Sequence, residues 1–196
     1  YTDFKWPLKR FKDYLIHQVQ KRDIKINMST KATPEMIKEG GYQSVVVAIG
    51  AVPLQPKIDG ADNPHVVHAL DAFDAPEKLG QNVVVIGGGE VGVEAGMVVA
   101  KTGRNVTVLE MRDTLAPDST LIHYKSMFQD AWEAIPTFGY KLNACCMNIT
   151  EEGVVYTDKD GKQELLKAEN VVMSIGYRDQ VNEALEFAGC ADDFYM

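Results

Sequence analysis

The stretch VVVIGGGEVGVEAG, residues 83–96, decides the fold of this 196-residue chain. Four branched apolar residues lead directly into three consecutive glycines, and the sequence that follows has a helical pattern. A buried strand that passes through a glycine turn into a helix is typical of phosphate-binding sites, because the first N–H groups of the helix have no partner within it. The stretch therefore predicts a strand–turn–helix unit that holds a nucleotide.

Three of these glycines, Gly87, Gly89 and Gly92, satisfy the spacing G-x-G-x-x-G. We expect Gly87 to turn the chain sharply, Gly89 to leave no side chain between backbone and pyrophosphate, and Gly92 to let the helix approach the sheet. The spacing alone is weak evidence, but here a strand precedes it and a helix and a second strand follow it. The candidate cofactor-binding residues of this segment are Gly87, Gly88, Gly89, Glu90, Val91 and Gly92.

An acidic residue, Glu110, ends the second strand 18 residues after Gly92. A carboxylate at this place accepts hydrogen bonds from the adenosine ribose and repels a 2′-phosphate, which favours NADH over NADPH. Arg112 opposes that preference, because a guanidinium can bind the phosphate. Met111 and Arg112 complete this part of the candidate site. The plain alternative is a glycine-rich turn without a ligand.

Hydrophobic patterns along the rest of the chain predict an α/β fold. Helices are expected at 8–20, 33–39, 69–73, 90–102 and 119–133. Strands are expected at 24–30, 44–50, 83–86, 105–110 and 170–176, with 51–62 as an extended crossing and 139–148 extended. Alternating runs at 153–158 and 162–167 flank an Asp-Gly step and indicate a hairpin. This order predicts a Rossmann-like three-layer parallel sheet with an antiparallel hairpin excursion.

Composition excludes several function classes. A net charge of −8 argues against a nucleic-acid surface. The longest apolar run, Val83–Ile86, is far too short to cross a bilayer and no signal peptide is apparent, so we expect a cytoplasmic protein without a membrane partner. The three cysteines and four histidines show no metal spacing, and no metal site is expected. Because the chain opens on Tyr1, it suggests an excised fragment.

The glycine motif GGGEVGVEA (87–95), the preceding AIGAVP (48–53) and the following VTVLE (106–110) resemble the two-dinucleotide-binding flavoproteins of the pyridine nucleotide-disulfide oxidoreductase type. More narrowly, residues 3–26, 79–96 and 171–178 resemble the carboxy-terminal half of the enoate reductase and dienoyl-CoA reductase group in the old yellow enzyme superfamily. The likeness covers essentially the whole chain.

That resemblance implies an enzyme with two halves. An amino-terminal barrel would carry FMN and an iron–sulfur cluster and reduce an activated C=C bond, while the carboxy-terminal half would bind FAD and NAD(P)H. The position of Glu94 would lie near the nicotinamide and flavin, although a solvent-facing glutamate is an equal alternative, and the catalytic residues stay unknown. Ile175 and Gly176 of the SIG segment would line the nicotinamide side.

Departures from the family pattern define the expected domains. No glycine precedes Gly40, so an earlier FAD-binding glycine motif is missing, as are the closing Gly-Asp segment, the barrel and the cluster cysteines. We therefore expect residues 1–62 to be a partial FAD-binding domain segment and crossover, 63–178 the NAD(P)H-binding Rossmann domain, and 179–196 the return toward a truncated FAD domain. The partners would be the missing FAD and barrel domains of the same polypeptide, without which the chain should not turn over.

Other functions remain open at this point. An NADH oxidase or a disulfide reductase domain would share the glycine motif, and a non-catalytic dinucleotide-binding module would share it too. A Rossmann methyltransferase also places its cofactor against a glycine turn and a carboxylate. Its motif normally lacks the third glycine spacing and the AIGAVP crossing found here.

Overall fold

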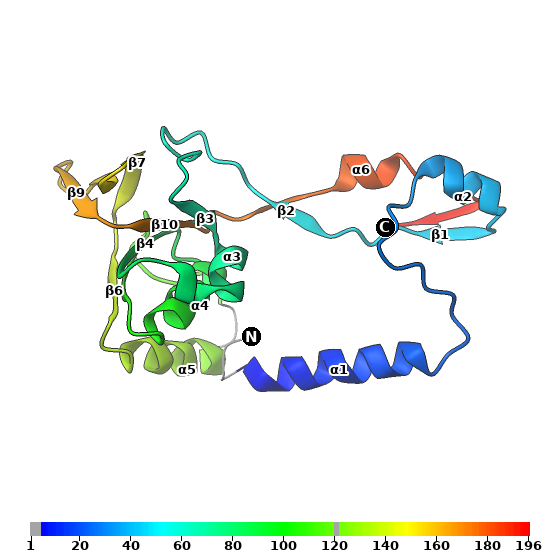
Figure 1. The fold of residues 1–196 in the computed structure, drawn as a ribbon, viewed down its shortest axis with the longest axis horizontal. Helices are drawn as coiled ribbons and strands as arrows, with labels where there is room; N and C mark the ends of the chain where they lie inside the picture. Colours follow the sequence, from blue (N-terminus) through cyan, green and yellow to red (C-terminus); the bar gives the residue numbers. More distant parts are fainter. Residues whose placement is uncertain (1–4, 120–121) are drawn as a thin grey trace. The chain divides into compact units, whose positions relative to one another are not determined.

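The computed structural model describes residues 5–119 and 122–196, without the side chains of 122–124. The chain forms two compact units (Figure 1). One unit contains the residues up to Val52 and again those from Tyr177 onward, and the other consists of Pro53–Gly176.

The unit Pro53–Gly176 is built on a five-stranded sheet in which all neighbouring strands are parallel. The strand order is β3 (Val66–His68), β10 (Asn170–Met173), β4 (Asn82–Ile86), β5 (Asn105–Leu109) and β6 (Phe138–Lys141). From β4 the chain adds β5 and β6 on one side and later returns as β10 on the other. The order thus reverses between β4 and β10, and crevices beyond the carboxyl ends of strands at such a point bind ligands in open α/β sheets.

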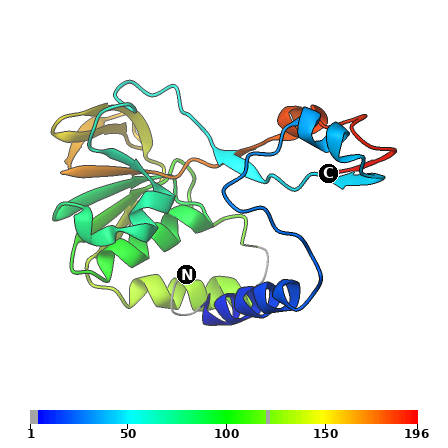
Figure 2. The ribbon, with the colours of Figure 1, turned by 45° about the vertical axis from the view of Figure 1, so that its right-hand side comes forward.

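Two further layers cover this sheet (Figure 2). Helices α3 (Ala69–Asp74) and α4 (Glu90–Ala100) pack against each other on one face of the sheet. A short 3-10 turn at Pro76–Lys78 follows α3. Helix α5 (Ile122–Glu133) lies on the same side. The opposite face is covered by the antiparallel strands β7 (Cys145–Thr150), β8 (Gly153–Thr157) and β9 (Gln163–Lys167). The three-layer prediction is confirmed, with the hairpin enlarged to three strands.

The apolar run that opens the glycine motif is the centre of the core. All four residues of Val83–Ile86 are buried, with exposed fractions of 5% or less. A strand covered on both faces needs apolar side chains at successive positions rather than at alternate ones, which explains the unbroken run in the sequence. On the α4 side, a Cβ at Gly96 would lie 2.9 Å from the Phe138 ring and 3.3 Å from Val106, so this glycine allows the helix to approach the sheet.

The other unit contains α1 (Trp6–Gln20), α2 (Pro34–Gly40), β1 (Ser44–Val46), α6 (Val181–Leu185) and β12 (Asp193–Tyr195). Strands β1 and β12 pair in parallel. Two short strands, β2 (Ala51–Pro53) and β11 (Tyr177–Asp179), pair with each other. As predicted, Thr33 caps α2: its side-chain oxygen accepts a hydrogen bond from the Met36 N–H at 3.3 Å.

Two sequence predictions in this unit are wrong. Residues 24–30 form no strand, because Ser29 has φ 53° and Thr30 donates its hydroxyl to the Met28 carbonyl in a turn. The strand expected at 44–50 is limited to β1, and it is not buried on both faces: Val46 is 71% exposed. The physical reason is that, among the described residues, β1 pairs with β12 alone in a two-stranded sheet, so it is not an inner strand of a larger sheet.

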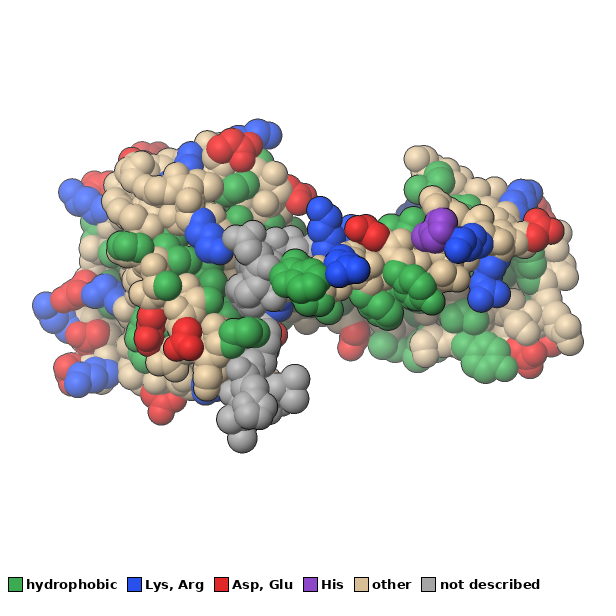
Figure 3. All heavy atoms as spheres, turned by 90° about the horizontal axis from the view of Figure 1, so that it is seen from below, with side chains coloured by type: hydrophobic (Ala, Val, Ile, Leu, Met, Phe, Trp, Pro, Cys, Tyr) green, Lys and Arg blue, Asp and Glu red, His purple; other side chains and the backbone are tan. Residues whose placement is uncertain are grey.

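Helix α1 has the predicted amphipathic pattern, yet it buries none of its residues. Its apolar side chains lie exposed beside basic ones (Figure 3). Among the described residues of this unit, only Ala184 and Cys190 belong to a buried core. In the part of the chain that the structure describes, no helix is long and apolar enough to cross a membrane.

Candidate functional site

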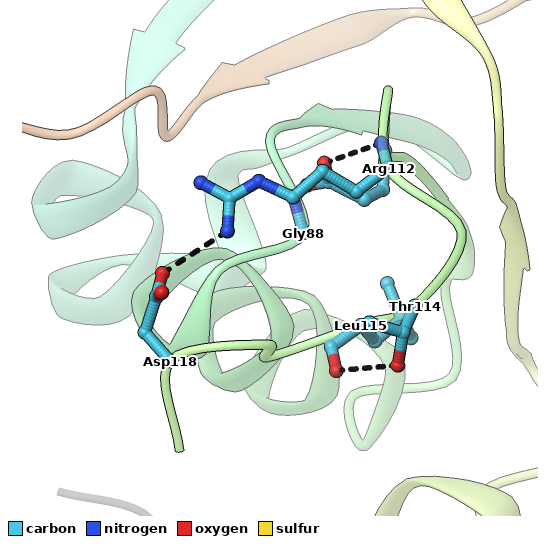
Figure 4. A network of polar contacts seen from close by, with 6 residues as sticks. Gly88, Arg112, Thr114, Leu115 and Asp118 are labelled. Atoms are coloured by element: carbon cyan, nitrogen blue, oxygen red, sulfur yellow. Dashed lines mark hydrogen bonds and ion pairs between the residues drawn. The ribbon is translucent and has the colours of Figure 1, made fainter. Parts of the chain in front are cut away.

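The glycine turn between β4 and α4 is fixed by the end of β5 and by the loop that follows it (Figure 4). The Gly87 N–H donates to the Leu109 carbonyl at 2.9 Å. The Gly88 N–H donates to Oε2 of Glu110 at 2.7 Å, and the Gly88 carbonyl accepts from the Ala116 N–H, also at 2.7 Å. The polar backbone groups of Gly88 are therefore bound within the protein, and the turn has one defined conformation.

Close packing explains three of the glycines. Gly87 has φ 101°, and a Cβ there would lie 2.2 Å from the Ser174 carbonyl oxygen. A Cβ at Gly92 would lie 1.9 Å from the Gly87 carbonyl oxygen, so this residue lets α4 approach the turn; the approach to the sheet itself takes place at Gly96. A Cβ at Gly88 would meet the Leu115 side chain at 2.6 Å.

Gly89 differs from the other glycines of the turn. Its φ of −66° and ψ of 177° suit any residue, and beyond the adjoining backbone no protein atom lies within 4 Å of the Cβ position. It is the N-cap of α4, where no side chain caps the helix, and the N–H groups of a helix's first turn have no intrahelical acceptor. Protein packing does not require a glycine here, whereas an anion lying against the backbone at the positive end of α4 would require one.

Glu110 is buried, with 6% of its surface exposed. Oε2 accepts the Gly88 N–H, and Oε1 accepts the Arg112 N–H at 2.8 Å. A carboxylate offers about four acceptor positions, and these two backbone donors use two of them. The residue thus connects the turn after β4 to the loop after β5 at the carboxyl edge of the sheet.

The loop after β5 contains residues that the sequence analysis did not single out. Leu115 is 3% exposed and Ala116 fully buried, and both pack beside Gly88. Ala116 has φ 44°, a conformation that costs a residue with a side chain about 1–3 kcal/mol. No local sequence signal marks an alanine for this conformation. Met111 and Arg112 are exposed, and Nη1 of Arg112 lies 3.2 Å from Oδ2 of Asp118.

The remaining candidates lie on α4 and after β10. Glu90, Val91 and Glu94 are half-buried on the first turns of α4. The Ser174 N–H donates to the Ile86 carbonyl at 2.9 Å, which places the SIG segment beside the glycine turn. Ile175 packs at the edge of the core, and the exposed Gly176 has φ 111° and accepts the Leu54 N–H. The backbone before Ile175 and Gly176 thus adjoins the glycine turn. Glu94 lies one helical turn after Glu90 on α4.

The cysteines and the possible metal ligands were also located in the structure. The three cysteines are free thiols, and burial raises the pKa of the Cys146 thiol to about 11. Within residues 5–119 and 122–196, no group of three His, Cys, Asp or Glu side chains is placed to hold a metal ion.

Comparisons with known proteins agree with the geometry. The pyridine nucleotide-disulphide oxidoreductase family matches residues 19–193. The chain is 31% identical over 184 residues to an NADH oxidase of Thermoanaerobacter brockii, covering 90% of this chain and 27% of that protein. It is 30% identical over 155 residues to a cinnamate reductase of Clostridium sporogenes, covering 79% of this chain and 23% of that protein. A solved 2-naphthoyl-CoA reductase complex superposes with a TM-score of 0.85 at 30% identity, covering 93% of this chain and 27% of that one. The chain therefore spans about a quarter of the length of these relatives.

Proposed function

The chain belongs to the pyridine nucleotide-disulphide oxidoreductases, flavin enzymes that use FAD and NAD(P)H, and we propose that its unit Pro53–Gly176 is the NADH-binding domain of such an enzyme. The observation that carries the proposal is the open space at Gly89, which stands at the N-terminus of α4 and needs no glycine for packing. Family membership also removes the methyltransferase alternative.

The residues of the turn fit a dinucleotide. The pyrophosphate would lie against Gly89 and the N–H groups of Glu90 and Val91, because these are the first donors that the turn leaves to a ligand. Gly87, Gly88 and Gly92 would act by shaping the turn rather than by direct contact, since their surroundings are filled by protein. The two remaining acceptor positions of Glu110 would receive the ribose hydroxyls.

On the nicotinamide side, the proposal assigns Ile175 and Gly176 to the wall of the site and Glu94 to positioning. The support is their placement: the SIG segment adjoins Gly87, and Glu94 lies one turn along α4 from Glu90. Met111 and Arg112, exposed after β5, would border the adenosine.

For the whole protein, we propose an NADH-dependent reductase of an activated C=C bond. When bound, NADH would supply the hydride and FAD would be its acceptor, and in the whole enzyme FMN and an iron–sulfur cluster in a barrel domain would carry the electrons to the substrate. Support comes from the relatives named for cinnamate and 2-naphthoyl-CoA reduction. Further support is the unit containing α1, which buries little of its apolar surface and fits a partial FAD domain.

The binding proposal is tested by calorimetric titration of the 196-residue chain with NADH, NADPH and S-adenosylmethionine. We expect NADH to bind more tightly than NADPH, and S-adenosylmethionine not to bind. Addition of FAD should leave no stable yellow complex after gel filtration, because only part of an FAD domain would be present. Failure of NADH to bind would refute the domain assignment, and a stoichiometric FAD complex would refute the assignment of a partial FAD domain.

The proposed reaction is tested with the full-length polypeptide that contains this chain, assayed without oxygen. NADH oxidation measured at 340 nm should depend on an added α,β-unsaturated acid such as cinnamate. If oxidation requires oxygen instead and cinnamate has no effect, the NADH oxidase alternative, which the Thermoanaerobacter relative favours, would replace this proposal.

A further inference from the structure

The loop from Glu110 to Ser119 has an uneven charge. It carries three carboxylates, Glu110, Asp113 and Asp118, against one cation, Arg112, so its net charge is −2. The Glu110 carboxylate is buried and accepts two backbone N–H groups. In this loop, Arg112 is therefore the one side chain suited to bind an additional phosphate on the adenosine ribose.

That cation is already engaged. Nη1 of Arg112 lies 3.2 Å from Oδ2 of Asp118, and both side chains are largely exposed, at 55% and 82%. The backbone N–H of Arg112 donates to Oε1 of Glu110, so the arginine backbone lies beside the carboxylate that we assign to the ribose. Figure 4 shows its guanidinium turned toward Asp118.

We propose that Asp118 is a specificity-determining residue that holds Arg112 in an ion pair and thereby disfavours dinucleotides with a 2′-phosphate. A phosphate monoester carries a charge of about −1.5 to −2 near neutral pH and is bound best by a guanidinium with both donors available. To bind it, Arg112 must leave Asp118, whose own charge then repels the phosphate. This inference rests on the proposed function, because it requires the nucleotide to lie with its ribose at Glu110.

The size of the effect is limited by exposure. Ion pairs between exposed side chains contribute up to about 1 kcal/mol, because water and salt screen them. We therefore expect a preference of several-fold rather than exclusion of NADPH. The ion pair would act together with Glu110 against a 2′-phosphate; the Glu110 carboxylate already accepts two backbone N–H groups.

The test is a set of titrations of the 196-residue chain with NADH and NADPH at low salt. In Asp118→Asn, the ratio of the NADH to the NADPH dissociation constant should rise about two- to fivefold. Asp160→Asn is the matched control, since it removes the same charge from an exposed residue in the turn between β8 and β9 and should leave the ratio unchanged. In the Arg112→Ala background, Asp118→Asn should have a much smaller effect.

The outcomes separate this inference from the proposed function. If the wild-type chain binds neither dinucleotide, the proposed function fails. If NADH binds but Asp118→Asn leaves the ratio of dissociation constants at its wild-type value, the role of the ion pair is overturned while the binding domain stands. The same holds if Asp118→Asn raises that ratio equally in the Arg112→Ala background. A wild-type chain that prefers NADPH would also overturn it. Thermal melts of each variant establish that it is folded.

Discussion

Replacing Gly89 by alanine should weaken nucleotide binding and leave the fold intact. The backbone angles at this residue are accessible to alanine, and beyond the adjoining backbone the added methyl group would meet no protein atom within 4 Å. If a pyrophosphate lies against this backbone, the methyl group occupies its place. Among the glycines of the turn, Gly89 is the one at which binding and folding can be separated.

The expected change in stability follows from two opposing effects. Replacing glycine by alanine at compatible angles stabilises a protein by about 0.4–1 kcal/mol, because the unfolded chain loses freedom. Alanine is a poorer N-cap than glycine, which costs a similar amount of roughly 0.5–1 kcal/mol. The two nearly cancel, so the melting temperature should change by less than about 4 °C. The dissociation constant for NADH should rise at least about tenfold, a loss of roughly 1.4 kcal/mol or more, and Gly89→Val should abolish binding.

Circular dichroism melts and calorimetric titrations with NADH measure the two quantities. Gly139→Ala is the matched control, because its Cβ would meet only the Val106 carbonyl oxygen at an ordinary 3.7 Å and it lies on β6. Gly87→Ala is the contrasting variant: with φ 101° and a contact of 2.2 Å, it should cost at least about 2 kcal/mol. NADH binding of wild-type strength in a folded Gly89→Ala chain would refute the reasoning.

Three further variants or treatments test the structure around the site. Glu110→Gln presents an amide donor where two backbone N–H groups need an acceptor, so it should lower the free energy of unfolding by about 1–3 kcal/mol in urea titrations; an unchanged value would contradict the two hydrogen bonds. Gly96→Ala forces a methyl group against a β6 ring at 2.9 Å and should cost about 1–3 kcal/mol, whereas an unchanged melting temperature would show that the helix can shift freely. At pH 8 the exposed Cys145 should react with iodoacetamide well before Cys146, because burial raises the pKa of Cys146 to about 11 and disfavours its thiolate; mass spectrometry of labelled peptides would show equal rates if this is wrong.

The sequence predicted the parallel sheet and its glycine turn because the relevant signals are local. A continuous apolar run predicts a strand buried on both faces, and β4 is such a strand. Thr33 and Pro34 mark the start of α2 in the same direct way. The alternating runs around Asp160 predict a hairpin, and β8 and β9 form it.

The errors arose where the outcome depends on partners distant in the sequence. The apolar run at 44–50 resembles that of β4, but in the structure β1 pairs with β12 alone and stays exposed. The prediction for 24–30 failed because an alternating segment forms a strand only beside another strand, and here the chain turns at Ser29 instead. The contact of Ala116 with Gly88 and the pairing of Arg112 with Asp118 depend on how the loop after β5 folds back, which no spacing rule encodes.

The central claim is that a pyrophosphate lies on the backbone at the start of α4, and amide NMR tests it most directly. ¹⁵N–¹H spectra of the 196-residue chain would be recorded with and without saturating NADH. We expect the largest shifts at the N–H groups of Gly89, Glu90 and Val91, with Gly139 unaffected. Saturation of binding without shifts at these three amides, or with the largest shifts in another element, would contradict it.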